Sequence, residues 1–371
     1  MKKALILLMS VLLAISLFAS CGKETNKTDN SQTDTTVINA VYPVDCTVNL
    51  HNEKQVKYLQ KDAGKLPFGV NGKKELSRPE AVEFGWTLYK NNVEEFVVSI
   101  SKNEDMSDSV TYTADTNSLT VYNLEIDTEY YWTVSADKEI STVSKFKTSS
   151  DAPRVLYVDG ITNVRDIGGW ITENGTRTRQ GLIYRCGRLN ESADNGCSVI
   201  ITESGKKVML NDLNVKTELD LRQIHTGETG GITSSPLGEG VTYINCPIDW
   251  SGDLHGDNNE QILKIFSILS DKSNYPIIVH CSIGTDRTGM LSFLLNALLG
   301  VPEEELYRDY MLSNFAEIGG KRKLTNLTES QYYNDMKNAP GNILSEKAYN
   351  FLHEIGVPKE QLNAIISNFT E

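Results

Sequence analysis

The stretch Tyr275-Pro276-Ile277-Ile278-Val279-His280-Cys281-Ser282-Ile283-Gly284-Thr285-Asp286-Arg287-Thr288-Gly289 decides the fold of the C-terminal part of this chain. It opens with an unbroken apolar run, as expected of a parallel strand buried on both faces. Residues 288–299 follow as a strongly apolar helix, which Gly300 and Pro302 end. A buried strand that leads through a short loop into a helix predicts an α/β domain with a central, mostly parallel sheet flanked by helices.

The loop between this strand and helix separates Cys281 from Arg287 by five residues. A loop of this length can curl so that its backbone N–H groups point inward and form an anion nest, to which the helix N-terminus adds positive potential. Arg287 adds a planar fork that suits two phosphate oxygens, and a positive field favours thiolates, the attacking form of cysteine. We therefore expect Cys281 to be a nucleophile in a phosphate-binding loop. The residues expected to bind phosphate are Ser282, Ile283, Gly284, Thr285, Asp286 and Arg287.

The loop resembles the His-Cys-x5-Arg-Ser/Thr-Gly signature of the cysteine-dependent protein tyrosine phosphatases. More narrowly, it resembles a bacterial tyrosine phosphatase family whose loop reads His-Cys-x-x-Gly-Lys-Asp-Arg-Thr-Gly. Four further segments are similar to that family, in the same order along the chain: 163–169, 181–187, 220–222 and 309–314. The resemblance covers about residues 154–371.

The resemblance implies a two-step mechanism in which Cys281 forms a phosphocysteine that water then hydrolyses. Arg287 would stabilise the equatorial phosphate oxygens, and the Thr288 hydroxyl would donate a hydrogen bond to the Cys281 sulfur. His280 is expected to order the loop through hydrogen bonds. No metal or other cofactor is required by this chemistry.

The general acid that protonates the leaving group is left open between two aspartates. The resemblance favours Asp286, directly before the arginine, and Asp249, on an upstream loop, is the rival; Asp253 is a weaker candidate. Asp166 is expected to orient Arg287, unless it forms only an exposed salt bridge of little consequence.

Two departures from the family pattern bear on function. Thr285 stands where the family usually has Lys, which counts against phosphoinositide substrates and leaves phosphotyrosine or small phosphomonoesters. Cys186 stands where the family prefers Ser, and it could protect Cys281 as a reversible disulfide. The alternatives are a phosphoinositide phosphatase, or a binding protein in which the phosphatase-like domain is vestigial.

Residues 40–150 have the sequence pattern of an all-β domain. Short alternating or β-branched runs at 82–86, 95–101, 131–136 and 144–148 are separated by polar turn clusters, which is typical of a sandwich. Trp86 and the approach to Tyr130 resemble a fibronectin type III-like module, a member of the fibronectin/immunoglobulin-like sandwiches. A short linker then leads into the domain at 154–371.

The beginning of the chain is similar to a bacterial lipoprotein signal peptide. Lys2 and Lys3 precede an apolar run that ends shortly before Cys21. We expect residues 1–20 to be removed, Cys21 to be lipidated, and the polar residues 21–39 to act as a tether. This predicts a protein of the cell envelope, anchored in a membrane through its lipid on the periplasmic or extracellular face.

Composition limits the partners. The 371 residues carry a formal net charge of −13, which argues against nucleic acid and against a broad electrostatic grip on an anionic membrane. Four further cysteines allow three complete disulfide pairings, and most are expected to be buried free thiols: Cys46, Cys186, Cys197 and Cys246.

Overall fold

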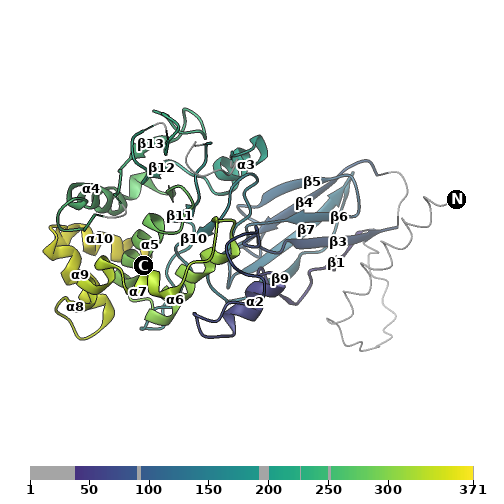
Figure 1. Ribbon diagram of the computed structural model, residues 1–371. Coiled ribbons are helices and arrows are strands. Elements are labelled where there is room, and N and C mark those ends of the chain that lie inside the picture. The colour runs from purple at the N-terminus through teal and green to yellow at the C-terminus, as the bar shows by residue number, and fades with distance from the viewer. Residues whose placement is uncertain (1–37, 90–92, 192–199, 226, 250–251, 371) are drawn as a thin grey trace. The chain divides into compact units, whose positions relative to one another are not determined.

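The computed structural model of the chain describes most of its residues (Figure 1). The predicted signal peptide and the lipidation residue Cys21 lie outside the described residues, as does Cys197. Among the helices that are described, none combines the length and apolar character needed to cross a membrane. The described ranges are 38–89, 93–191, 200–225, 227–249 and 252–370.

The chain divides into two compact units whose boundaries differ from the predicted ones. One, the β unit, is formed by the described residues of Ile38–Val48, Glu83–Leu119 and Glu129–Lys147. The other, the α/β unit, combines Thr148–Glu371 with two earlier stretches, Asn49–Val82 and Thr120–Thr128. Part of the stretch 40–150, predicted as one sandwich, therefore belongs to the α/β unit.

The α/β unit is built on a five-stranded sheet with the order β10-β11-β14-β12-β13 (Figure 1). Strands β11, β14, β12 and β13 are parallel, and β10 is antiparallel to β11. The predicted α/β fold with a mostly parallel sheet is confirmed. The strands are β10 Arg165–Asp166, β11 Ile183–Cys186, β12 Thr217–Asp220, β13 Thr242–Asn245 and β14 Ile277–His280.

Both faces of this sheet are covered, which explains the unbroken apolar run of β14. Ile277 and Val279 point into the larger core cluster, and Ile278 points into a smaller one on the opposite face. On the larger side α5 packs on α9, and α4 packs on α10. Every residue of α5 is buried, in keeping with its strongly apolar sequence.

The helices of this unit include one that the spacing of apolar residues in the sequence predicts. The helical spacing of Ile262, Ile265, Phe266 and Leu269 predicts a helix over 259–269, and α4 forms there with all four side chains buried. The helices are α2 Glu53–Leu59, α3 Glu203–Lys207 with the π-helix η2 Val208–Asp212, α4 Asn259–Ser270, η3 Lys272–Asn274, α5 Arg287–Leu298, α6 Glu303–Leu312, η4 Ser313–Phe315, α7 Leu324–Thr328, α8 Gln331–Asn338, α9 Leu344–Glu354 and α10 Lys359–Thr370.

The β unit contains two antiparallel sheets with the orders β1-β3-β6 and β2-β9-β7-β4-β5, and β8 pairs with β7. Aromatic side chains of the two sheets meet in its core, where the rings of Phe84 and Trp132 lie 5.1 Å apart at 83°. Trp86 and Tyr130 are also buried in this core. The strands are β1 Ile38–Tyr42, β2 Thr47–Val48, β3 Val82–Leu88, β4 Phe96–Ser101, β5 Val110–Ala114, β6 Ser118–Val121, β7 Glu129–Ala136, β8 Glu139–Ile140 and β9 Ser144–Thr148.

Residues 49–82 lie in the sequence between β2 and β3 but pack in the α/β unit. The Tyr58 side chain of α2 is fully buried there, 5.5 Å from the ring of Phe315, and its hydroxyl donates to the carbonyl of Ala63 at 2.8 Å. Val70 joins the same core cluster. The segment, which we call the strap, is therefore an integral part of the α/β core.

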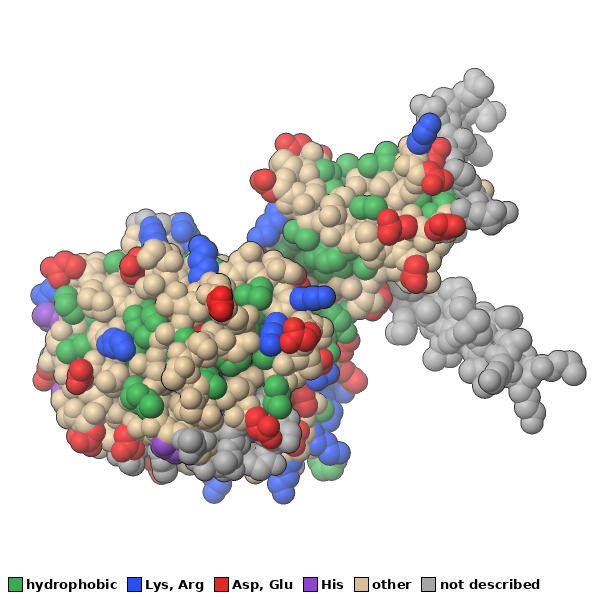
Figure 2. Space-filling model, turned by 90° about the horizontal axis from the view of Figure 1, so that it is seen from above, with side chains coloured by type: hydrophobic (Ala, Val, Ile, Leu, Met, Phe, Trp, Pro, Cys, Tyr) green, Lys and Arg blue, Asp and Glu red, His purple; other side chains and the backbone are tan. Residues whose placement is uncertain are grey.

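Charged side chains of both signs are distributed over the surface. On the face shown in Figure 2, Lys and Arg side chains are interspersed with Asp and Glu.

Candidate active site

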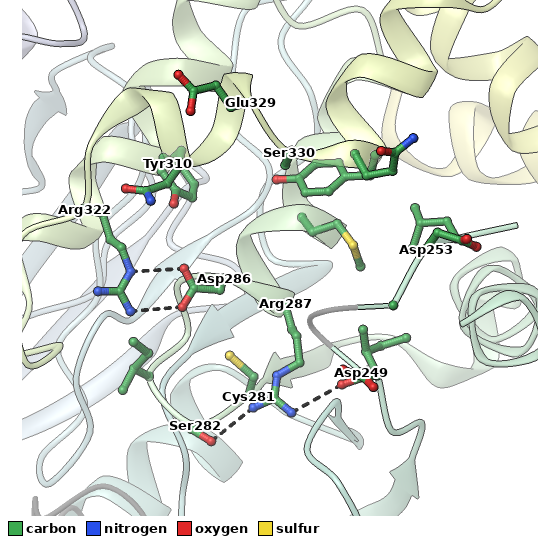
Figure 3. Close-up of a pocket in the computed structure, with 18 of the residues that line it drawn as sticks. Asp249, Asp253, Cys281, Ser282, Asp286, Arg287, Tyr310, Arg322, Glu329 and Ser330 are labelled. Carbon is green, nitrogen blue, oxygen red and sulfur yellow. Dashed lines mark hydrogen bonds and ion pairs between the residues drawn. The ribbon is translucent and has the colours of Figure 1, made fainter. Parts of the chain in front are cut away.

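Cys281 lies at the base of a pocket of about 1060 Å³ in the α/β unit (Figure 3). It follows β14 directly, and the loop that it opens leads into the N-terminus of α5. Only 2% of Cys281 is exposed, so the thiol can be reached only through the pocket. Ser282, Ile283 and Arg287 line the same pocket.

The loop presents its amides and turns its carbonyls away. Asn163 Nδ2 donates to the carbonyls of Ile283 (3.1 Å) and Gly284 (3.0 Å), and Arg185 Nη2 donates to Gly284 at 2.6 Å. The backbone N–H groups of residues 282–286, by contrast, donate to none of the described residues. Unpaired amides at a helix N-terminus form an anion-binding nest.

Gly284 is required by this arrangement. Its φ of +67° lies in the left-handed region, and a Cβ there would come within 2.2 Å of the Cys186 carbonyl oxygen on β11. Any other residue would push the loop off the neighbouring strand. Thr285, next to it, is fully buried.

A buried ion cluster supports the loop from behind. Asp309 on α6 accepts hydrogen bonds at 2.6 Å from Arg165 Nε and from Arg185 Nη1, the side chain that also holds Gly284. Burial raises the pKa of Asp309, but the two guanidinium groups lower it more, so the net pKa lies below its ordinary value. Burial and the nearby Arg165 charge lower the pKa of Arg185 to about 10.

Arg287 is held by Glu228, a residue that the sequence analysis did not single out. Its Nη1 and Nη2 atoms donate to the two oxygens of Glu228, each at 2.8 Å. Burial would lower the pKa of Arg287, but these hydrogen bonds raise it above its ordinary value. Glu228 thus takes the Nη1–Nη2 edge of the fork, and Nη2 also donates to Ser282 Oγ at 3.3 Å (Figure 3). The guanidinium group is therefore fixed on the loop that holds Cys281.

His280 is fully buried, and both of its ring nitrogens lie near hydrogen-bonding oxygens. Its Nε2 lies 2.9 Å from a Glu218 oxygen, and its Nδ1 lies 3.3 Å from the Cys281 carbonyl oxygen. Glu218, Asp220 and His280 bring ligand-type atoms within 4.8 Å of one another, the spacing of a metal site. The carboxylate oxygens already accept hydrogen bonds from Ser235, Arg222 and Tyr243.

Thr288 differs from expectation. Its hydroxyl is fully enclosed in the first turn of α5 and has no hydrogen-bond partner among the described residues. The expected bond to the Cys281 sulfur is therefore not formed in this structure.

Asp286 lines the pocket and is bound by another residue that the sequence analysis missed. Arg322 donates to both of its carboxylate oxygens, from Nε and Nη2, each at 3.1 Å (Figure 3). Asp249 and Asp253 also line the pocket, on the side away from Arg322 (Figure 3). Both aspartate rivals for the general acid therefore border one cavity.

Asp166 does not orient Arg287, so that prediction is wrong. Its carboxylate is fully buried among other partners: Arg154 Nη1 at 3.3 Å and the amides of Gly168 (2.9 Å) and Gly181 (2.7 Å). Position 166 is on β10, at the sheet edge away from the catalytic loop. Glu228 occupies the place next to Arg287 instead.

The positions of Cys186 and Cys281 do not favour a disulfide between them. Side chains of successive strand residues alternate between the two faces of a sheet. Cys186 packs in the smaller core cluster, and Cys281 belongs to the larger one on the other face. Cys46, Cys186, Cys246 and Cys281 are all free thiols.

Residues 156–371 match the model of the tyrosine phosphatase family. A curated relative from Cupriavidus necator, named as a tyrosine-protein phosphatase, is 25% identical over 173 residues, which is 43% of this chain and 63% of the relative. A tyrosine-protein phosphatase from Nostoc commune is 30% identical over 82 residues, 22% of this chain and 25% of the relative. The chain thus spans less than two thirds of either relative.

Solved structures with some likeness are more distant. They include the catalytic core of the Saccharomyces cerevisiae PP-IP phosphatase Siw14 (16% identity, TM-score 0.29, covering 43% of this chain and 86% of that one). Another is Pseudomonas aeruginosa TpbA (14% identity, TM-score 0.27, covering 51% of this chain and 88% of that one). At these identities and TM-scores, the solved structures do not indicate the function of this chain.

Proposed function

Since the chain belongs to the tyrosine phosphatase family over residues 156–371, we propose that it hydrolyses phosphate monoesters with Cys281 as the nucleophile. One observation carries the proposal: the buried thiol lies at the base of a pocket, in a loop whose amides are unpaired and whose arginine is held in place by Glu228. Such a cradle stabilises the equatorial oxygens of a transferring phosphoryl group.

The proposed reaction has two steps, formation of a phosphocysteine and its hydrolysis. In the first, the Cys281 thiolate attacks phosphorus, the S–P bond forms as the ester P–O bond breaks, and an acid gives its proton to the leaving oxygen. In the second, water attacks phosphorus, the S–P bond breaks, the acid regains a proton from the water, and inorganic phosphate leaves. Splitting the hydrolysis in this way is the general logic of nucleophilic catalysis.

Asp286 is the general acid that we favour. It precedes Arg287 directly and lines the pocket, with both oxygens fixed. Asp249 remains the rival, since it borders the same pocket. Rates and pH profiles of Asp286→Ala and Asp249→Ala on one aryl phosphate decide between them: an unchanged profile in Asp286→Ala would exclude it.

Phosphotyrosine or small phosphomonoesters are the substrates that we propose. Thr285 supplies no positive charge where a lysine would, which disfavours polyphosphorylated lipid headgroups. The test compares turnover of p-nitrophenyl phosphate, a phosphotyrosine peptide and a phosphoinositide by the wild type, Cys281→Ser and, as a matched control, Cys186→Ser. We expect Cys281→Ser alone to lose all turnover. Absence of turnover in the wild type would favour the alternative of a binding protein.

The remaining parts of the chain extend the proposal. The two antiparallel sheets and their shared aromatic core support a fibronectin type III-like sandwich for the β unit. The lipobox-like sequence ending at Cys21 supports export and lipid anchoring in the cell envelope. Intact-mass analysis of membrane fractions from cells expressing the wild type or Cys21→Ser tests the anchor: a diacylglyceryl mass is expected only in the wild type.

A further inference from the structure

Asp286 occupies the N-cap position of α5, yet it does not cap the helix. An aspartate at this position ordinarily folds back so that its carboxylate accepts hydrogen bonds from amides of the first turn. Here the side chain makes no capping hydrogen bond. It extends instead to Arg322, which binds both of its oxygens (Figure 3). Arg322 therefore competes with the helix end for this carboxylate.

We propose that Arg322 is a positioning residue, which keeps the carboxyl group of Asp286 turned into the pocket, ready for proton transfer. This inference rests on the proposed phosphatase function. A carboxyl group offers about four lone-pair sites, so the two that Arg322 occupies leave room for the transferred proton. The same pair stabilises the carboxylate after the proton has left, when it must accept a proton from the attacking water.

Arg322 is itself fixed through its backbone by Asn314. The Arg322 amide donates to Asn314 Oδ1 at 2.7 Å, and Asn314 Nδ2 donates to the Arg322 carbonyl at 3.2 Å. Asn314 is fully buried, and its Nδ2 also donates to the carbonyl of Met311 on α6 at 2.9 Å. The chain that carries Arg322 is thus tied to the end of α6.

The strap holds the segment that leads to Arg322. Gly72 donates its amide to the Asn314 carbonyl at 2.8 Å and accepts from the Ile318 amide at 3.0 Å, and the Leu76 amide donates to Phe315 at 2.6 Å. Gly72 has a φ of +73°, and a Cβ there would lie 2.4 Å from the Gly320 oxygen. Contacts therefore run without a break from the strap through Asn314 and Arg322 to Asp286.

Leaving-group dependence distinguishes positioning of the acid from substrate binding. Since kcat/KM reports the steps up to the phosphocysteine, a misplaced acid slows a poor leaving group more than a good one. We expect Arg322→Met to lower kcat/KM about 10- to 100-fold for phenyl phosphate and less than about threefold for p-nitrophenyl phosphate. Lys323→Met removes a neighbouring exposed charge outside the pocket lining. This control should change kcat/KM for neither of the two esters.

Two further variants sharpen the test. Asp286→Asn combined with Arg322→Met should be no slower on phenyl phosphate than Asp286→Asn alone, because both changes remove the same function. Gly72→Ala should shift the leaving-group dependence in the same direction as Arg322→Met, and thermal unfolding of each variant verifies that it folds.

Separate results overturn the inference and the proposed function. If Arg322→Met slows both esters equally, raises only KM or has no effect, Arg322 does not position the acid. If the wild type hydrolyses neither ester, the proposed function fails instead.

Discussion

The catalytic-loop residue Arg287 and the upstream residue Glu228 form a two-pronged ion pair, with both N–O distances at 2.8 Å. Glu228 comes from the loop after β12, and Arg222 Nη1 fixes that loop by donating to the Glu228 carbonyl at 2.9 Å. The pair sets the plane of the guanidinium group before any phosphate binds. Such preorganisation is what electrostatic stabilisation of a transition state requires.

Replacing Glu228 by Gln should impair catalysis. The amide retains only one acceptor atom, so the guanidinium group of Arg287 loses its fixed plane, and small misplacements cost about 10- to 100-fold in rate. The measurement is kcat/KM for p-nitrophenyl phosphate. Glu239→Gln, an exposed change, serves as the control. A faster Glu228→Gln enzyme would mean that Glu228 competes with phosphate for Arg287.

The same pair should stabilise the protein in a pH-dependent way. Burial raises the pKa of Glu228, but the hydrogen bonds from Arg287 and the Gln223 amide lower it more, to below its ordinary value of 4.5. Its stabilisation is therefore fully present above about pH 4.5 and is lost as pH falls through the lowered pKa. The difference in free energy of unfolding between wild type and Glu228→Gln should be constant from about pH 7 to 5 and shrink below that. A difference that does not change with pH would contradict this assignment.

Removing the charge of Asp309 should destabilise the α/β unit strongly. Asp309→Asn leaves two buried guanidinium groups, Arg165 and Arg185, without their counterion. Breaking a buried pair in this way costs about 3–5 kcal/mol. Urea unfolding measures the loss. Asp62→Asn, which breaks the exposed pair between Asp62 and Lys65, is the control and should leave the unfolding midpoint nearly unchanged. Equal stability of the two variants would refute the role of the cluster.

Truncating Tyr58 should test whether the strap belongs to the α/β core. Tyr58→Ala removes a fully buried ring and should cost about 3–5 kcal/mol of unfolding free energy. Tyr58→Phe removes only the hydroxyl that donates to Ala63 and should cost about 1 kcal/mol. If Tyr58→Ala unfolds like the wild type, the strap does not contribute to this core.

Oxidation should not join Cys186 to Cys281. The two side chains belong to core clusters on opposite faces of the sheet, so a disulfide needs a rearrangement of β11 or β14. Mild peroxide should inactivate wild type and Cys186→Ser at the same rate, followed by activity and intact mass. A loss of two hydrogens seen only in the wild type would show that the disulfide forms.

Local sequence was sufficient for the parts of the site that lie within one stretch of chain. The order of buried strand, loop and apolar helix follows from periodicity, and Cys281, Asp286 and Arg287 are fixed relative to one another by the five intervening residues. The spacing of apolar residues likewise predicted α4 and α5 within a residue or two. These are short-range relationships, in which the geometry of the backbone leaves few alternatives.

Tertiary structure alone decided which distant side chains complete the site. Glu228 lies 59 positions before Arg287, and Arg322 lies 36 positions after Asp286, with no periodic signal linking the members of either pair. The strap appeared to belong with the strands around it, because a sequence does not reveal which core an intervening segment enters. Pairings of this kind depend on which loops the folded sheet and helices bring to one edge, and only the packed chain specifies that.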